Sequence, residues 1–216
     1  VKIDGKTVTD LYPTELGSSC EAWDDGLYPG CDGSSSQPSW CTSKWCYVDP
    51  CDCTIGTNPT TSSYLEGATY EGKQIFYSYA TCGNDNTYNE PPSDLQVSEC
   101  SKEWDEDKFG TEACPCVGID GLKGSTDVII GGATYSDLYP AEIGSSCEAW
   151  DDDKYPGSCD VSEKADWCGK KWCYVDPSNC IVDSGPYKSS YIPHGMFQGS
   201  ELYYSYVTCK SDNSYD

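Results

Sequence analysis

Cysteine content constrains the fold of this chain more than any other feature. There are 16 cysteines among 216 residues, which approaches the content of a disulfide scaffold. Zinc sites favour Cys-x-x-Cys pairs with histidine nearby, whereas the close cysteines here are Cys51 with Cys53 and Cys114 with Cys116, and the only histidine is His194. The spacing therefore predicts disulfides and an oxidising, extracellular or lumenal compartment. The cysteines assigned to disulfides are Cys20, Cys31, Cys41, Cys46, Cys51, Cys53, Cys82, Cys100, Cys114, Cys116, Cys147, Cys159, Cys168, Cys173, Cys180 and Cys209.

One cysteine-rich module is present twice. The segment GSSCEAWDD begins at Gly17 and again at Gly144, and WC, KWCYVDP and YSY-x-TC recur in the same order. Cys20 and Cys147 are separated by 127 positions (147 − 20), and most other matched cysteines keep that period. Repeats of this kind fold as similar units. The sequence therefore predicts a first module at residues 1–89, a linker at 90–127 and a second module at 128–216.

Four cysteines lie outside the repeated set of six in each module. They are Cys51, Cys100, Cys114 and Cys116, and Cys51 is replaced by Ser178 in the second copy. Because six cysteines allow fifteen pairings, spacing does not select the bonds inside a module. We expect Cys51 to bond with one linker cysteine and the other two linker cysteines to bond with each other. Ser178 is then expected to mark the natural end of an array.

The predicted fold class is small, disulfide-rich α+β, with short helices, a few antiparallel strands and much irregular chain. Low aliphatic content leaves cross-links to supply stability that a large core would otherwise give. Expected elements are extended leading segments at 1–8 and 127–135, helices at 15–23 and 142–150, a helical turn at 40–45, a strand at 46–48, strands at 74–81 and 201–208 with one exposed face, and a capped helix starting near Ser93.

Charge removes several classes of partner. The chain carries 36 acidic against 13 basic residues, a formal net charge of −23, and every base is lysine. The electrostatic field of so negative a chain repels nucleic acid and anionic membranes. Because the chain has no arginine, it also lacks a guanidinium group for bidentate hydrogen bonds to phosphate or base edges. No apolar run approaches the length of a membrane span. We therefore expect no nucleic-acid partner and no membrane insertion.

The chain is not expected to be an enzyme. His194 has Gly67 as its counterpart, so it cannot belong to a catalytic site shared by both modules. The repeated acids Asp24, Asp25, Asp151 and Asp152 follow a tryptophan, which suits glycoside hydrolysis only superficially, because adjacent residues rarely aim two carboxylates at one bond. The same four acids are the candidate calcium ligands, although no spacing resembles a helix-loop-helix calcium loop.

Recurring aromatic residues are the candidate glycan or partner contacts. Tryptophan and tyrosine beside acids and amides hold sugar rings by stacking and hydrogen bonding, but the same rings could form the core of a module poor in leucine and isoleucine. The Ser/Thr-rich stretch 57–63 is a candidate for O-linked sugars, which would make the chain a glycoprotein. The candidate contacts are Trp40, Trp167, Tyr77, Tyr79, Tyr204 and Tyr206.

Four motifs together resemble a cysteine-rich tandem repeat of predicted secreted or surface proteins of marine protists. In this chain they are GSSCEAWD at 144–151, WCGKKWCYVDP at 167–177, YYSYVTC at 203–209 and ACPCVGID at 113–120. The resemblance covers nearly the whole chain and implies an extracellular module that often occurs in several copies. No catalytic or binding residue comes with it.

These features favour a secreted, acidic structural repeat that assembles into, or decorates, a filament, hair or surface coat, with itself or related repeats as partners. The leading segments at 1–8 and 127–135 are expected to add a strand to a neighbouring module. The alternatives are a secreted carbohydrate-binding module and a calcium-dependent adhesion protein. No cofactor is expected, apart from calcium under the last alternative.

Overall fold

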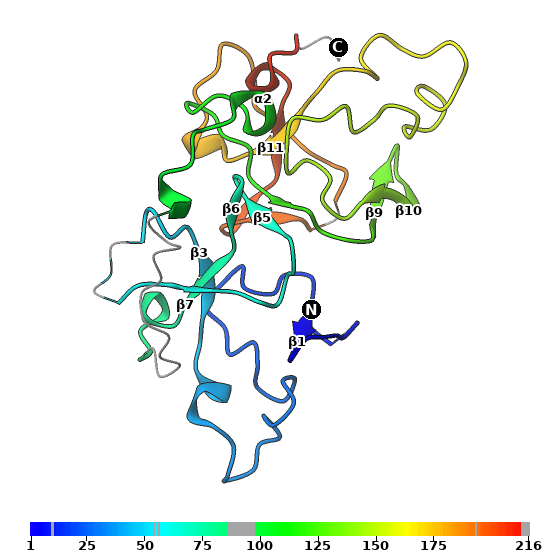
Figure 1. The fold of residues 1–216 in the computed structure, drawn as a ribbon. Coiled ribbons are helices and arrows are strands. Elements are labelled where there is room, and N and C mark those ends of the chain that lie inside the picture. The colour runs from blue at the N-terminus through cyan, green and yellow to red at the C-terminus, as the bar shows by residue number, and fades with distance from the viewer. Residues whose placement is uncertain (10, 54, 56, 86–97, 193, 213–216) are drawn as a thin grey trace. The chain divides into compact units, whose positions relative to one another are not determined.

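The computed structural model describes residues 1–9, 11–53, 55, 57–85, 98–192 and 194–212. Contacts divide the chain into two compact units (Figure 1). The first contains Val1–Ala68 with Lys73–Lys102, and the second contains Thr69–Gly72 with Glu103–Asp216. Residues of the linker are therefore shared between the two units, with the division after Lys102.

The first unit is built on a three-stranded antiparallel sheet in the order β3-β7-β4. Tyr77 in the central strand lies opposite Tyr47 on one side and Thr60 on the other. A small hairpin, β1 with β2, precedes the sheet. The elements are β1 (Lys2–Ile3), β2 (Lys6–Thr7), the 3-10 helix η1 (Ser39–Thr42), β3 (Cys46–Val48), β4 (Thr60–Thr61), β6 (Lys73–Gln74), β7 (Phe76–Ser78) and the 3-10 helix η2 (Ala80–Cys82).

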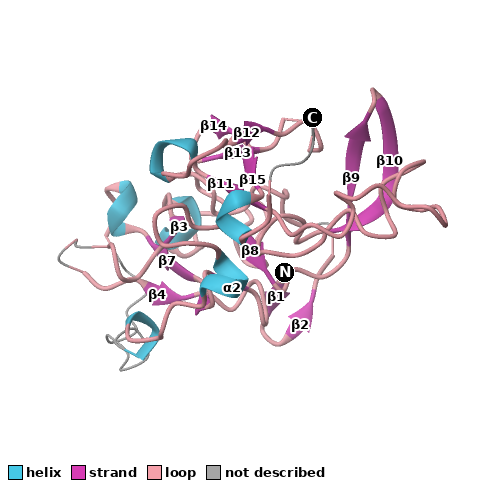
Figure 2. Ribbon diagram, turned by 90° about the horizontal axis from the view of Figure 1, so that it is seen from above, coloured by secondary structure: helices cyan, strands magenta, loops and turns pink. Residues whose placement is uncertain are grey.

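The second unit repeats this sheet as β11-β15-β12 in the same register, with Tyr204 opposite Tyr174 and Tyr187. Its leading hairpin, β9 with β10, is longer. Figure 2 shows how short most strands are and how much of the chain is loop. The elements are β5 (Thr69–Tyr70), α2 (Glu106–Phe109), β8 (Ile119–Asp120), β9 (Ser125–Ile130), β10 (Ala133–Pro140), β11 (Cys173–Val175), η3 (Pro177–Asn179), β12 (Tyr187–Lys188), β13 (Met196–Phe197), β14 (Ser200–Glu201), β15 (Tyr203–Ser205) and η4 (Val207–Cys209).

The small, disulfide-rich α+β class is confirmed, and so is the strand at Cys46–Val48. The helical turn expected at 40–45 is present as Ser39–Thr42, and the chain is already extended at Ser43. The helices expected at 15–23 and 142–150 are wrong, because both segments form consecutive turns. The Trp23 and Trp150 indole N–H groups donate to the carbonyls of Ser19 and Ser146, and such local side-chain bonds compete with helix formation. The helix start expected near Ser93 lies outside the described residues. None of the described helices is long and apolar enough to span a membrane.

The strands expected at 74–81 and 201–208 are present but shorter, and the expectation of one exposed face is wrong. Ile75, Phe76, Ser78 and Tyr79 are all buried, so both sets of alternating side chains are covered by other parts of the unit. The leading segments also differ from expectation. Each folds back as a hairpin on its own module, and Val128 is fully buried there.

Aromatic residues supply most of each core. The first core consists of Leu16, Trp23, Trp45 and Tyr79. The second has the counterparts of these residues and adds more, including Val117 from the linker. It is the larger of the two: Val117, Val128, Ile130, Tyr139, Ile143, Trp150, Trp172, Tyr174 and Tyr206. Edge-to-face ring contacts such as Trp172 with Tyr174, 5.3 Å between centroids, add to burial.

The glycine that opens GSSCEAWDD is required in both copies by its backbone conformation and by a close contact with a tyrosine ring. Gly144 has φ +76°, and a Cβ atom there would lie 2.3 Å from the Cδ2 atom of Tyr174. Its carbonyl accepts the Tyr174 N–H at 2.8 Å, which fixes the turn against β11. Gly17 and Tyr47 repeat this arrangement in the first copy.

Gly144→Ala is expected to lower the free energy of unfolding of the second unit by about 2 to 4 kcal/mol, from left-handed backbone strain and a clash with the ring. Gly157→Ala is the matched control, since Gly157 has φ +75° with open space around its Cβ position. It should cost only about 1 kcal/mol. Chemical denaturation measures both, and equal losses would show that the ring contact contributes nothing.

Candidate functional site

A buried carboxylate organises the core of each copy. Asp24 is 2% exposed, and its Oδ1 atom accepts hydrogen bonds from the hydroxyls of Tyr12 at 2.7 Å and Tyr64 at 2.6 Å. Its Oδ2 atom accepts from the Trp45 indole N–H at 2.8 Å. Both oxygens therefore have partners inside the core.

Asp151 makes the same three bonds in the second copy. Tyr139 and Tyr191 donate to Oδ1 at 2.7 and 2.8 Å, and Trp172 donates to Oδ2 at 2.8 Å. Desolvation raises the pKa of Asp151, and these hydrogen bonds offset only part of that effect. The repeated aspartate is thus a structural centre that holds three aromatic side chains together.

The second aspartate of each repeated pair lies in different surroundings. Asp25 is exposed, and Asp152 forms an ion pair with Lys164 at 2.5 Å. For the calcium alternative, the buried member of each pair already has both oxygens engaged by aromatic donors. Binding calcium at Asp24 would require breaking its bonds to tyrosine and tryptophan.

Burial and the neighbouring carboxylates delay ionisation of the core tyrosines. Desolvation, followed by the hydrogen bond to Asp24, raises the pKa of Tyr12 far above 10.0. Desolvation raises the pKa of Tyr47 to about 12. Desolvation and the charge of Asp151 likewise raise the pKa values of Tyr139 and Tyr191.

Alkaline titration should therefore show two classes of tyrosine. A folded-state pKa above the unfolded value stabilises the fold below the unfolded pKa, near 10, and this stabilisation is lost as the pH rises further. We expect exposed tyrosines to ionise first and the core tyrosines to ionise in one steep step together with unfolding. Tyrosinate absorbance and near-ultraviolet circular dichroism measure the two processes. Gradual ionisation of all tyrosines with the fold intact would contradict the core assignment.

The candidate aromatic contacts separate into buried and accessible members. Tyr79 and Tyr206 are each 5% exposed and belong to the cores. Tyr77 and Tyr204 are half-buried, edge-to-face against Trp45 and Trp172. Trp40 and Trp167 are half-buried beside Tyr28 and Tyr155, with centroids 5.0 and 4.9 Å apart. His194 is exposed and has φ +58°, at the position that Gly67 occupies in the first copy.

Fourteen cysteines form seven disulfides, and their number fits an oxidising environment outside the cytosol. Cys51 bonds with linker residue Cys100, as expected. The expected bond between the remaining linker cysteines is wrong, because they bond with the second module instead. Cys46 and Cys53, assigned above to disulfides, are free thiols. The bonds are Cys20–Cys82, Cys31–Cys41, Cys51–Cys100, Cys114–Cys180, Cys116–Cys173, Cys147–Cys209 and Cys159–Cys168.

Comparisons with protein-family models, with curated proteins and with solved structures gave no match to this chain. The two copies of the module can still be compared with each other, position by position, across the period of 127. The two copies differ at one surface, which linker residues cover in the second copy, whereas among the described residues none covers it in the first.

The covering element is residues 103–118, which we call the linker segment. Asp105 caps its helix α2 by accepting the N–H groups of Asp107 and Lys108 at 3.1 and 3.2 Å. Phe109 follows and is 5% exposed, and the Trp104 indole donates to the Gly110 carbonyl at 2.8 Å. The segment is thus a turn of helix, a second turn at 112–113, and a Cys-Pro-Cys whose last cysteine forms an isolated bridge with Val175.

Backbone hydrogen bonds fix the linker segment to the second copy. The N–H of Cys147 donates to the Lys108 carbonyl at 2.7 Å, Val117 N–H donates to the Tyr174 carbonyl at 2.7 Å, and Ile181 N–H donates to the Ala113 carbonyl at 2.8 Å. The Thr208 hydroxyl accepts the Thr111 N–H at 3.0 Å and donates to the Cys114 carbonyl. We call the receiving residues the acceptor surface: Cys147, Cys173, Tyr174, Cys180, Ile181 and Thr208.

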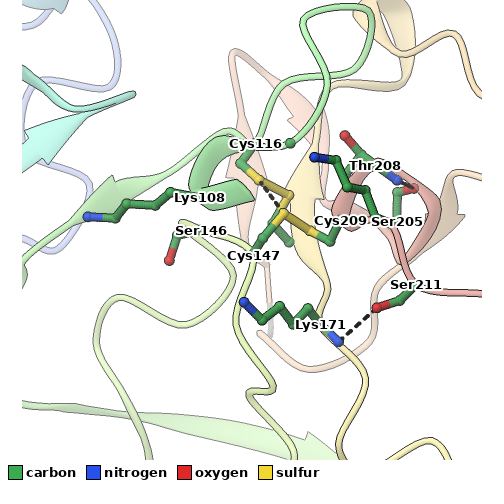
Figure 3. The surroundings of a disulfide bond; sticks show 12 residues. Lys108, Cys116, Ser146, Cys147, Lys171, Ser205, Thr208, Cys209 and Ser211 are labelled. Carbon is green, nitrogen blue, oxygen red and sulfur yellow. Dashed lines mark hydrogen bonds between the residues drawn. A yellow bond between two sulfur atoms is a disulfide. The ribbon is translucent and has the colours of Figure 1, made fainter. Parts of the chain in front are cut away.

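Two disulfides complete this attachment. Cys116 bonds with Cys173 and Cys114 with Cys180. Figure 3 shows Cys116 beside the Cys147–Cys209 disulfide, with Thr208 next to it; the Cys116 and Cys147 sulfurs are 3.7 Å apart. The four sulfurs of Cys116, Cys147, Cys173 and Cys209 are close enough for a metal site. Because all four are bonded in disulfides, they present no thiolate to a metal.

Sequence reasoning identified the linker as disulfide-bonded but not the surface that receives its second half. The spacing of two linker cysteines did carry a signal for this surface. Cysteines two residues apart in extended chain point to the same side, so Cys114 and Cys116 can both reach one neighbouring surface. The buried role of Asp24 and Asp151 was also missed, although each lies in a repeated segment that also contains tryptophan.

Proposed function

We propose that this chain is a non-catalytic, secreted structural repeat protein that assembles into, or decorates, an extracellular filament, hair or surface coat. The observation that carries the proposal is the covalent linker. Its first half bonds with the first copy through Cys51–Cys100, and its second half bonds with the second copy through Cys114–Cys180 and Cys116–Cys173. Each half of the linker is therefore held covalently on the module beside it, which constrains the unfolded chain and stabilises the attachment.

Strand pairing supports the same proposal. Strand β5 comes from the first copy of the module and pairs with β8 of the linker, with Tyr70 opposite Ile119. Strand β13 is the counterpart of β5 in the second copy, and among the described strands its partner is β14. Met196 at β13 is 57% exposed. An exposed strand edge of this kind suits pairing with a related repeat.

A non-catalytic role is supported by the use of the repeated polar groups. Asp24 and Asp151 hold the cores together, and desolvated carboxylates of this kind would be the natural candidates for acid–base chemistry. The resemblance to repeats of secreted or surface proteins supports the extracellular location, as does the number of disulfides.

Electron microscopy of the native material tests this function. We expect filaments or a regular coat whose regular spacing is lost on treatment with a thiol reductant, because disulfides hold each half of the linker on its module. Sedimentation of the purified protein over a wide concentration range is the companion measurement. Material that is uniformly monomeric in both measurements would refute an assembly role.

A carbohydrate-binding module is the second candidate, favoured by one observation. Trp40 and Trp167 are half-buried in both copies and lie edge-on to a tyrosine, which leaves part of each indole available for stacking on a sugar ring. Reproducible hits on a glycan array that disappear in the Trp40→Ala, Trp167→Ala double variant would favour this candidate over a purely structural role.

A further inference from the structure

The first copy of the module has counterparts of Cys147, Cys173, Tyr174, Cys180 and Thr208 of the acceptor surface, and among the described residues no linker segment lies on them. By the period of 127, the counterparts of Cys147, Cys173, Cys180 and Thr208 are Cys20, Cys46, Cys53 and Thr81. The Cys46 sulfur lies 3.9 Å from the Cys20 sulfur, beside the Cys20–Cys82 disulfide. The arrangement around Cys173 is therefore reproduced, except that Cys46 has no bonded partner in the described part of the chain.

Exposure differs between the copies where the linker segment would lie. Thr208 is fully buried, whereas Thr81 is exposed. Ser145 and Ser146 are 3% and 2% exposed, whereas their counterparts Ser18 and Ser19 are exposed. Val175 is buried, and its counterpart Val48 is only half-buried.

Hydrogen-bonding groups show the same difference. In the second copy Tyr174 gives its carbonyl, and Cys147 its N–H, to the linker segment. Within the described residues, the carbonyl of Tyr47 and the N–H of Cys20 have no such partner. The Thr81 hydroxyl, whose counterpart bridges Thr111 and Cys114, instead lies 3.7 Å from the Cys53 sulfur.

We propose that Cys46 and Cys53 form an acceptor site for the linker segment of another repeat, bonding to its Cys-x-Cys as Cys173 and Cys180 bond to Cys116 and Cys114. This inference deepens the proposed assembly function and rests on it for its biological setting. The partner is a peptide with the chemistry of residues 103–118: a capped helical turn, a glycine at the position of Gly110, and two cysteines separated by one residue.

The peptide needs a glycine at the position of Gly110 because its backbone there passes close to a threonine hydroxyl of the acceptor surface. Gly110 has φ +76°, and a Cβ atom there would lie 2.4 Å from the Thr208 hydroxyl oxygen. Thr81 presents the same hydroxyl in the first copy, so a larger residue at this position would prevent docking. One contact would be lost in the first copy, because Lys210, which forms exposed ion pairs with Asp107 and Glu106, corresponds to Gly83. Exposed ion pairs contribute little to binding.

The chemistry is thiol–disulfide exchange with a small disulfide such as oxidised glutathione as oxidant. For each bond, one thiol of the first copy and one thiol of the segment are oxidised to a disulfide. One oxidised glutathione is reduced to two glutathione thiols, which take up the two protons. Burial raises the pKa of the Cys46 thiol, which favours the protonated, slowly reacting form until a partner is docked.

A synthetic peptide of residues 103–118 tests the proposal with the whole 216-residue chain in a glutathione redox buffer. We expect an adduct of one peptide per chain with two new disulfides, joining Cys46 to peptide Cys116 and Cys53 to peptide Cys114, as read by mass spectrometry of proteolytic fragments. A peptide with Gly110→Val keeps both thiols and should give roughly tenfold less of this adduct, because docking bonds are lost. The Cys46→Ser, Cys53→Ser chain should give none.

Three results would overturn the proposal. They are a bond between Cys46 and Cys53 themselves, no doubly bonded adduct while the seven native disulfides persist, or equal yields with the native and Gly110→Val peptides. The outcome is independent of the assembly test. Filaments without adduct would refute this inference alone, whereas adduct with strictly monomeric native material would refute the assembly function alone. Native material whose mass falls on reduction would identify the donor as a separate chain.

Discussion

Replacing Cys116 and Cys173 together by serine is expected to lower the free energy of unfolding of the second unit by about 2 to 3 kcal/mol. The bond has a sequence separation of 57 residues, but the Cys114–Cys180 bond still closes nearly the same loop in the variant, so the conformational entropy regained by the unfolded chain is that of the short ring between the two bonds. Hydrogen exchange in increasing denaturant, resolved by peptide, measures the loss. We expect peptides from residues 103–118 to lose protection together with those of β11.

Cys46→Ser is the matched control, because Cys46 occupies the position of Cys173 in the first copy and carries a free thiol. It should change the stability of the first unit by less than about 1 kcal/mol. If the single and double variants lost similar stability, packing of the sulfur rather than the covalent bond would account for the effect.

Asp151→Ala is expected to lower the free energy of unfolding of the second unit by about 3 kcal/mol. The change leaves the Trp172 indole and the hydroxyls of Tyr139 and Tyr191 without their acceptor inside a buried core, and each unsatisfied buried donor costs about 1 kcal/mol or more. Relief of the desolvation that raises the pKa of Asp151 offsets part of this loss. Chemical denaturation followed by tryptophan fluorescence measures the result.

Two further variants separate the buried role from general charge effects. Asp24→Ala should destabilise the first unit by a similar amount, since Asp24 has the same three donors. Asp152→Ala removes only a partly exposed ion pair with Lys164 and should change stability by less than about 0.5 kcal/mol. A large effect at Asp152 and none at Asp151 would contradict the assignment of the structural centre.

The sequence predicted the disulfide-rich class, the strand at Cys46–Val48 and the bond from Cys51 into the linker, because each follows from local pattern or from a difference between copies. The helices expected around Trp23 and Trp150 failed for a physical reason. The indole N–H of each tryptophan bonds to nearby backbone there, and the following aspartate accepts hydrogen bonds from three aromatic donors in the core.

The acceptor surface could not be predicted from the module alone. Cys46 and Cys173 have nearly identical neighbours in sequence, yet one is free and the other bonded, because the partner comes from outside the repeated unit. The burial of the candidate aromatic residues could not be predicted from the sequence either. Alternation in a tyrosine-rich segment predicts a strand but does not reveal which of its faces other residues cover, and at 75–79 residues of both alternating sets, such as Ile75 and Phe76, are buried.

Disulfide mapping of the 216-residue chain, after alkylation of its free thiols, tests most directly the claim that the linker is bonded into the second module and that the first module retains the matching site. We predict fragments joining Cys114 to Cys180 and Cys116 to Cys173, together with alkylated Cys46 and Cys53. A bond between Cys114 and Cys116, or between Cys46 and Cys53, would contradict it.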